Sequence, residues 1–238
     1  MIEIRDISVA FGGVTALNRV SADLGDAIVG IIGPNGAGKT TLLNVFSGFV
    51  APRAGSIRAF GADLLAMAAH RRARWGVRRS FQTDQVVDDL TVADNVRAVL
   101  DPLPYGAAAK QAEIDRALDF VGLARRHDAP GAALNAFERR LVELAKAVVG
   151  APKIVLLDEP GAGLRPPEVA LLREAILGIE KYRGAMTLLI DHDVELIATT
   201  CPSTMVLDFG ELLALGPTAD VLKDERVKAA YLGVEEFA

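Results

Sequence analysis

The stretch Gly33-Pro34-Asn35-Gly36-Ala37-Gly38-Lys39-Thr40 decides how the rest of this sequence is interpreted. It fits the pattern G-x-x-x-x-G-K-[ST], and it lies between the apolar run AIVGII at 27–32 and the helical pattern KTTLLNVFSGF at 39–49. Gly36 and Gly38 let the backbone approach an anion closely, and a helix beginning near Lys39 directs its positive end at the same point. The sequence therefore predicts a phosphate-binding loop between a buried strand and a helix.

Two side chains of this loop have predicted roles toward a nucleotide. Lys39 supplies positive charge to the β- and γ-phosphates, and the hydroxyl of Thr40 ligates Mg²⁺. A chance glycine-rich turn is the alternative, but the strand before the loop and the helix after it favour phosphate binding. We expect the whole segment to surround the nucleotide: Gly33, Pro34, Asn35, Gly36, Ala37, Gly38, Lys39, Thr40 and Thr41.

A second signal is the apolar run Lys153-Ile154-Val155-Leu156-Leu157, which is followed directly by Asp158, Glu159 and Pro160. An acid at the end of a strand is placed to hold Mg²⁺, the role predicted for Asp158. Glu159 is placed to polarise an attacking water as general base. A strand that ends in a solvated acidic turn is the alternative. Because Asp158 and Glu159 occur in the same chain as the phosphate loop, the functional interpretation is favoured.

Composition limits the remaining classes of protein. The 238 residues are 51% apolar and 24% charged, which excludes intrinsic disorder for the bulk of the chain and suits one domain with a subdomain. A net charge of -5 gives no overall electrostatic footprint for nucleic acid. The single cysteine, Cys201, indicates a reducing compartment. The N-terminus does not resemble a signal peptide, and no apolar run approaches the roughly 20 residues of a membrane span.

The order of elements predicts an α/β protein. Strand and helix patterns alternate around the two motifs, which indicates a parallel sheet with a helical insert. The expected elements are a short strand at 2–4 with a turn at Gly12-Gly13, an Arg-rich helix at 70–74, a strand at 77–81, helices within 88–149, a helix at 169–180, a strand at 187–190, a hairpin at 205–215 and one last helix at 218–231.

These motifs together resemble an ABC-type ATPase, the nucleotide-binding subunit of a transporter. The resemblance rests on GPNGAGKTT, Phe81-Gln82, IVLLDEP and LLIDHD, and it covers essentially the whole chain. It implies a P-loop NTPase core with a mixed sheet, an N-terminal antiparallel β subdomain and an inserted helical subdomain. We expect one domain over 1–238, with the helical subdomain at 83–150.

Further details resemble the ATPase subunits of branched-chain amino-acid importers, with urea and short-amide relatives sharing the pattern. They are Phe11-Gly12-Gly13, RRSFQ with LTVADNV, EPGAGL followed by Pro-Glu, and the terminal AAYLG. The resemblance implies ATP and Mg²⁺ as cofactors, transmembrane permease subunits as partners and a place at the cytoplasmic face of the inner membrane. No nucleic-acid partner is expected.

The resemblance also assigns roles to three separate side chains. Phe11 occupies the adenine-stacking position, with packing at a strand end as the alternative. Gln82 matches the glutamine that touches Mg²⁺ and the attacking water, with an ordinary surface glutamine as the alternative. His192 follows a buried strand between two acids and matches the histidine that reaches the γ-phosphate. His70 and His127 are expected to be solvated.

The sequence departs from the family pattern at two places. Where the family has LSGGQ, which caps the γ-phosphate bound by the opposite subunit, this chain reads Leu134-Asn135-Ala136-Phe137-Glu138. Arg165 stands where aspartate or asparagine is usual. Phe137 brings bulk where close backbone approach is needed. We therefore expect a weakened half-site, a heterodimer with a second ABC ATPase and poor hydrolysis by the isolated chain, unless the altered loop still works.

The sequence leaves three other interpretations. The segment HRRARWGVRR at 70–79 carries five arginines, but the acidic chain favours a solvated helix over an anionic-ligand patch. A regulatory subunit with weak catalysis agrees with the altered loop and disagrees with intact Glu159 and His192. A non-transport ABC protein acting on DNA or ribosomes would carry tandem cassettes or long inserts, and neither is present.

Overall fold

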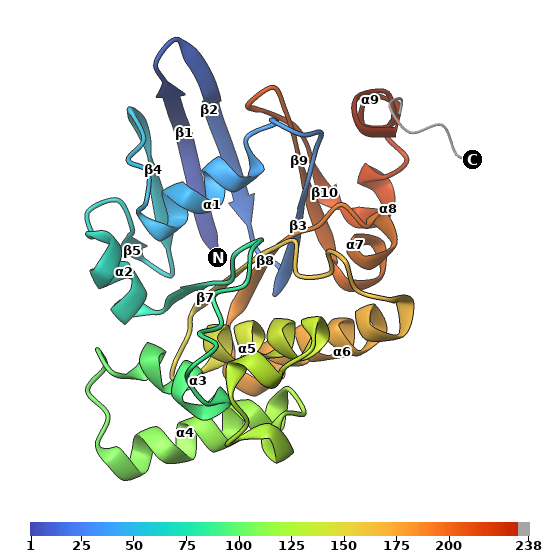
Figure 1. Cartoon of the computed structure of the whole chain (residues 1–238). Coiled ribbons are helices and arrows are strands. Elements are labelled where there is room, and N and C mark those ends of the chain that lie inside the picture. Colours follow the sequence, from blue (N-terminus) through green and yellow to red (C-terminus); the bar gives the residue numbers. More distant parts are fainter. Residues whose placement is uncertain (233–238) are drawn as a thin grey trace. The chain divides into compact units, whose positions relative to one another are not determined.

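A computed structural model describes residues 1–232 of the chain (Figure 1). The chain forms two compact units. The first unit contains Met1–Ala73 and the chain from Leu188 onward, and the second contains Arg74–Thr187. The last glycine of the terminal AAYLG pattern, Gly233, lies outside the described residues.

An antiparallel sheet of the first unit has the strand order β2-β1-β4-β5. Its strands are β1 (Ile2–Phe11), β2 (Val14–Leu24), β4 (Ala54–Ala59) and β5 (Ala62–Asp63). Burial alternates along the start of β1, and Ile2 and Ile4 are fully buried. The strand is longer than the predicted 2–4, because a bulge at Asp6 (φ 49°) lets pairing continue after the alternation shifts. The predicted turn at Gly12-Gly13 is confirmed.

A second, mixed set of strands in the first unit has the order β10-β9-β3-β8. The strands are β3 (Ile28–Ile32), β8 (Met186–Ile190, which begins in the other unit), β9 (Ser203–Asp208) and β10 (Glu211–Pro217). β3 and β9 are parallel, whereas β9 and β10 form the predicted antiparallel hairpin. Every residue of β3 is buried, as expected for a central strand.

The helices of the first unit flank these strands in the sequence. They are α1 (Lys39–Ser47), α2 (Ala69–Trp75, which ends in the other unit), α7 (Val194–Thr200), α8 (Thr218–Val221) and α9 (Glu225–Val227), followed by a π-helical turn at Lys228–Leu232. The prediction of one helix at 218–231 is wrong. The Asp224 carboxylate accepts the N–H of Arg226 at 2.8 Å and starts a new helix there, so the segment breaks into short pieces.

The second unit combines two parallel strands with a set of helices. The strands β6 (Val77–Arg79) and β7 (Ile154–Asp158) pair in register, and all of β7 is buried. The helices are α3 (Val92–Leu100), α4 (Ala107–Phe120), α5 (Ala136–Val148) and α6 (Pro166–Arg183), with 3₁₀ turns at Ala124–Arg126 and Gly131–Ala133. α6 begins earlier than the predicted 169, because Pro166 at its first position suits a helix start.

A buried carboxylate joins three helices of the second unit. Glu113 of α4 accepts hydrogen bonds from Arg116, from Arg183 of α6 at 2.7 Å and from the backbone N–H of Gly150, after α5, at 3.1 Å. Burial alone would raise the pKa of Glu113, but the hydrogen bonds and charges of Arg116 and Arg183 outweigh it and lower this pKa. We call this group of four residues the Glu113 cluster.

The expectation that 70–79 is a solvated stretch holds for Arg71 and Arg74, which are exposed, and is wrong for Arg72 and Arg78. Arg72 is 5% exposed and donates to the carbonyl groups of Val45 and Phe46 at the end of α1 and to Met67. Arg78 is also buried, at 7% exposure. A guanidinium that satisfies helix C-terminal carbonyls can be buried in an acidic chain without marking an anion site.

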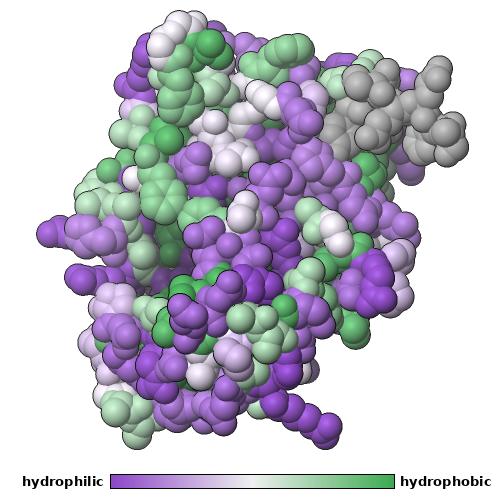
Figure 2. All heavy atoms as spheres, in the orientation of Figure 1, coloured by the Kyte–Doolittle hydropathy of each residue, from purple (hydrophilic) through white to green (hydrophobic). Residues whose placement is uncertain are grey.

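Within residues 1–232 the structure has no helix that combines the length and the apolar character needed to cross a membrane. Figure 2 shows hydrophobic side chains at the surface of one face of the molecule. Some of them lie in the region of the β1–β2 hairpin. Phe11 (52% exposed) and Val14 (70% exposed) flank the turn of that hairpin.

Candidate nucleotide site

The phosphate loop connects β3 to α1, as predicted, and its glycines are structurally required. Gly38 has φ 101°, and a Cβ atom on it would lie 2.6 Å from the carbonyl oxygen of Ala16. A Cβ on Gly33 would lie 2.0 Å from the carbonyl oxygen of Leu207. Gly36 needs glycine only for its φ of 81°, because a Cβ atom on it would meet no other atom within 4 Å. The loop therefore packs on β2 at Gly38 and on β9 at Gly33, whereas at Gly36 no other protein atom lies close.

Lys39 is buried at the start of α1 and holds the loop in shape. Its Nζ donates to the carbonyl oxygens of Gly33 at 2.6 Å and Pro34 at 3.0 Å. The N-cap of α1 is Gly38, and no side chain caps this helix. No side chain therefore competes with an anion for the N-terminal N–H groups of this helix. Helix N-termini of this kind bind phosphate in other proteins. Thr40, next in the chain, is exposed.

His192 lies between β8 and α7 in the first unit, and it is exposed. The two flanking acids serve the backbone. Asp191 is buried and accepts the N–H of Asp193 at 3.0 Å, and Asp193 caps α7 by accepting the N–H groups of Glu195 and Leu196. The acids beside His192 therefore fix the turn that presents the imidazole.

In the second unit, two of the predicted site residues, Gln82 and Glu159, are brought together. Gln82 Nε2 donates to Glu159 Oε2 at 2.8 Å. Glu159 has a φ of 52°, which is unfavourable for a residue with a long side chain. Such strain concentrates at functional sites, where the surrounding structure holds the residue in place.

Asp158, the residue before Glu159, has a partner that sequence reasoning missed. Arg79 Nη2 lies 2.8 Å from Asp158 Oδ2, with side-chain exposures of 6% and 4%. The signal available in the sequence was that Arg79 lies in one predicted strand and Asp158 directly follows another; the structure pairs these strands in parallel as β6 and β7.

The loop that replaces LSGGQ is closed by its own side chains. Asn135 Oδ1 accepts the N–H of Glu138 at 2.9 Å, and Glu138 Oε2 accepts the N–H of Asn135 at 3.0 Å. This reciprocal pair is a capping box at the N-terminus of α5. Arg126 also pairs with Glu138, with its Nε 3.0 Å from Oε1. Glu138 is therefore engaged within its own unit.

The second departure, Arg165, is the N-cap residue of α6. Its guanidinium pairs with Glu168 at 2.6 Å, and its backbone N–H donates to the same carboxylate at 2.9 Å. With 80% of its side chain exposed, Arg165 keeps most of its surface accessible to solvent.

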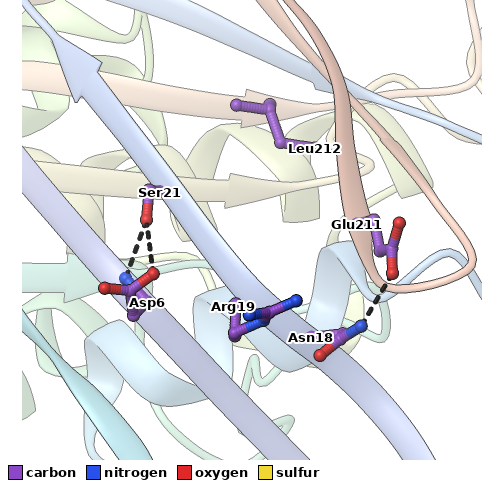
Figure 3. A pocket seen from close by; sticks show the side chains of 6 residues that line it. All are labelled: Asp6, Asn18, Arg19, Ser21, Glu211 and Leu212. Carbon is purple, nitrogen blue, oxygen red and sulfur yellow. Dashed lines mark hydrogen bonds between the residues drawn. The ribbon is translucent and has the colours of Figure 1, made fainter.

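One pocket of the first unit, with a volume of about 350 Å³, is lined by residues outside these motifs (Figure 3). It is lined by Asp6, Asn18, Arg19, Ser21, Glu211 and Leu212. Hydrogen bonds from Ser21 to Asp6 and from Asn18 to Glu211 cross parts of its wall. None of the residues predicted to bind the nucleotide lines this pocket.

Comparisons with known proteins identify the class to which this site belongs. A family model described as ABC transporter matches residues 17–162. The chain belongs to this family and is an ATP-binding subunit, an ATPase coupled to transport. The predicted ABC ATPase fold, with an antiparallel β subdomain and a mixed sheet, is confirmed.

Individual relatives match nearly the full chain. The branched-chain amino acid transport ATP-binding protein LivG of Salmonella typhimurium is 32% identical over 249 residues, covering 98% of both chains. The lipopolysaccharide export ATP-binding protein LptB of Acidithiobacillus ferridurans is 36% identical over 206 residues, covering 87% of this chain and 85% of LptB. The ATP-binding cassette MJ1267 in its ADP conformation superposes with a TM-score of 0.86 at 26% identity, covering 98% of both chains. LivG and LptB are both ATP-binding proteins of transport systems, and they serve different cargoes, branched-chain amino acids and lipopolysaccharide.

Proposed function

We propose that this chain is the ATP-hydrolysing subunit of an importer for branched-chain amino acids or related small polar solutes. The observation that supports the cargo class is the length of the LivG match, which covers 98% of both chains, whereas the LptB match covers 87% and 85%. The motifs around Phe11, Gln82 and the segment after Glu159 resemble the same importer group. Permease subunits would be its membrane partners, at the cytoplasmic face of the membrane.

Binding of the nucleotide uses residues of the first unit. The N–H groups at the start of α1 and the Nζ of Lys39 neutralise phosphate charge, and Phe11, half exposed at the end of β1, stacks on the adenine. The exposed His192 steadies the γ-phosphate. Gly33, Gly36 and Gly38 keep the loop backbone close enough to surround the phosphates.

The residues predicted to hold Mg²⁺ have suitable chemistry. Mg²⁺ prefers oxygen ligands, and Thr40 offers an exposed hydroxyl while Asp158 has one carboxylate oxygen, Oδ1, with no hydrogen bond from the described residues. Gln82 completes the proposed set through its amide oxygen, since its Nε2 is used toward Glu159. The ion would supply charge neutralisation of the bound phosphates.

Hydrolysis is assigned to Glu159. Its carboxylate accepts a proton from the attacking water, and Gln82, hydrogen-bonded to Oε2, orients that carboxylate. Replacing Glu159 by Gln should lower ATP turnover by about 10²–10⁴-fold, the usual contribution of a general base, and leave ATP binding intact. Loss of binding together with turnover would contradict this role.

The chain is proposed to pair with a second ABC ATPase in a heterodimer, in which a bound ATP is enclosed between the two subunits. The closed loop at Asn135 and Glu138 supports this, because its side chains are engaged with each other. A regulatory subunit with little catalysis of its own is the second candidate, and the same loop favours it. Turnover measured with and without the partner subunit separates the two.

Cargo can be tested in the cells that make this protein. Cells carrying Glu159→Gln should lose uptake of radiolabelled leucine, with wild-type cells as the control. Uptake of urea and short amides is measured in parallel. Normal uptake of all these solutes, together with a defect in lipopolysaccharide export, would contradict the importer assignment.

A further inference from the structure

The ion pair of Arg79 and Asp158 has the strongest claim to a function that neither the motifs nor the relatives assign. Arg79 ends β6, Asp158 ends β7, and the two parallel strands bring both side chains to the same edge. The Nη2–Oδ2 distance is 2.8 Å, and neither side chain is more than 6% exposed. Each charge is therefore removed from water and depends on the other.

The geometry leaves Asp158 half engaged. Oδ2 accepts from Arg79, whereas Oδ1 receives no hydrogen bond from any residue that the structure describes. The guanidinium is itself held in place, because it lies 5.0 Å from the centre of the Phe81 ring. A planar cation fixed on one oxygen determines the direction in which the other oxygen points.

The same segment acts on the neighbouring acid. Gln82, three positions after Arg79, donates to Glu159. Arg79 and Gln82 thus each hold one of the two adjacent acids at the end of β7. The two contacts differ in charge, because the amide of Gln82 is neutral and the guanidinium of Arg79 is permanently positive.

We propose that Arg79 is a positioning residue that orients Asp158 and offsets its charge, and so sets how strongly the site attracts a divalent cation. The inference rests on the proposed role of Asp158 as a Mg²⁺ ligand. With Arg79 present, the pair carries no net charge, so the cation gains little long-range attraction. Without it, the same carboxylate presents a full negative charge to the cation.

The test measures binding and does not depend on turnover. Binding of a fluorescent, non-hydrolysable ATP analogue is followed while Mg²⁺ is titrated. The half-saturating Mg²⁺ concentration should fall about tenfold in Arg79→Gln, since a buried like charge is removed near the cation. It should stay within about twofold of wild type in Arg79→Lys, which keeps the charge.

Asp158→Asn provides the matched background. It should raise the half-saturating Mg²⁺ concentration by itself, because the proposed site loses a carboxylate ligand. If Arg79→Gln does not fold, Arg79→Met, whose unbranched stem also packs on Phe81, carries the same prediction. Thermal melting checks each variant before titration.

The outcomes separate the two claims. An unchanged or raised half-saturating Mg²⁺ concentration in Arg79→Gln, with a clear effect of Asp158→Asn, overturns the inference and leaves the proposed function in place. No effect of Asp158→Asn on the Mg²⁺ dependence would instead remove Asp158 from the proposed cation site.

Discussion

The phosphate loop and the loop at 134–138 occupy the same kind of position, directly before the N-terminus of a helix, and they treat that terminus in opposite ways. At α1 the N-cap is Gly38, and no side chain caps the helix. At α5 the N-cap is Asn135, and it forms a capping box with Glu138. The first helix leaves its N–H groups to a ligand, and the second satisfies two backbone N–H groups internally.

The difference follows from residue type. Gly38 has a conformation that a residue with a Cβ adopts poorly, and it brings the backbone within contact of β2. Asn135 has an extended backbone and a side chain that competes for the helix N–H groups. In this chain, the helix N-terminus without a side-chain cap is the one predicted to bind a ligand, and the capped one is not.

The largest effect is expected at Gly38. Gly38→Ala places a Cβ 2.6 Å from the Ala16 carbonyl oxygen, so the loop must move, and displacement of a binding group by about 1 Å can cost about 100-fold. ATP affinity, measured by equilibrium binding, should fall by about that factor. Gly36→Ala is the matched control, with φ 81° but no atom within 4 Å, and should lose much less. Equal losses would contradict the packing argument.

A pH-dependent effect is expected from the Glu113 cluster, which stabilises the unit that contains the capped loop. The pKa of Glu113 lies below its ordinary value of 4.5 in the folded state, so its stabilisation is fully present above that pH and is lost as the pH falls through the lowered folded pKa. Glu113→Gln should lower the free energy of unfolding by about 2 kcal/mol at pH 7, less than a fully buried pair because Arg116 is largely exposed. Urea unfolding at pH 7 and pH 3.5 measures this.

The difference between wild type and Glu113→Gln should shrink at the lower pH, because Glu113 of the unfolded chain, at its ordinary pKa of 4.5, is largely protonated there. A difference that stays constant between the two pH values would show that the charge of Glu113 contributes nothing.

A smaller effect is expected at Phe11, at the end of β1. Phe11→Ala should weaken ATP binding about tenfold, because stacking of a base on an aromatic ring contributes about 1–3 kcal/mol. Phe209→Ala is the control, since Phe209 is an exposed aromatic of the same unit at 89% exposure. Both variants are titrated with fluorescent ATP. Equal weakening by the two would contradict base stacking at Phe11.

The smallest effect is expected at the capped loop. Asn135→Ala removes an N-cap and should lower the free energy of unfolding by about 1 kcal/mol, while Asn135→Ser keeps the cap. ATP affinity of the isolated chain should be unchanged in both. A fall in that affinity would show that the loop contributes to the nucleotide site of its own subunit.

Local signals in the sequence predicted the phosphate loop, the strand before Asp158 and the β9–β10 hairpin. Each is encoded by a few consecutive residues with a clear period or a glycine requirement. The role of Gln82 followed only from the family resemblance, and its hydrogen bond to Glu159 was not predicted.

Contacts between distant residues were not predicted. The burial of Arg72 depends on where α1 ends, and the Arg79–Asp158 pair depends on the parallel register of β6 and β7. Composition indicated solvated arginines because it carries no information on which carbonyl or carboxylate a folded chain brings near. The broken helix after Thr218 shows the same limit, because helical periodicity does not detect a competing cap at Asp224.

The most direct test of the contrast between the two loops is ATP turnover of the purified chain alone, beside a variant that combines Asn135→Ser with Phe137→Gly. The account predicts negligible turnover by the wild-type chain and at least about tenfold more in the variant, as expected for restoring one group that contacts the transition state. Robust wild-type turnover that the two substitutions leave unchanged would contradict it and indicate a self-sufficient homodimer.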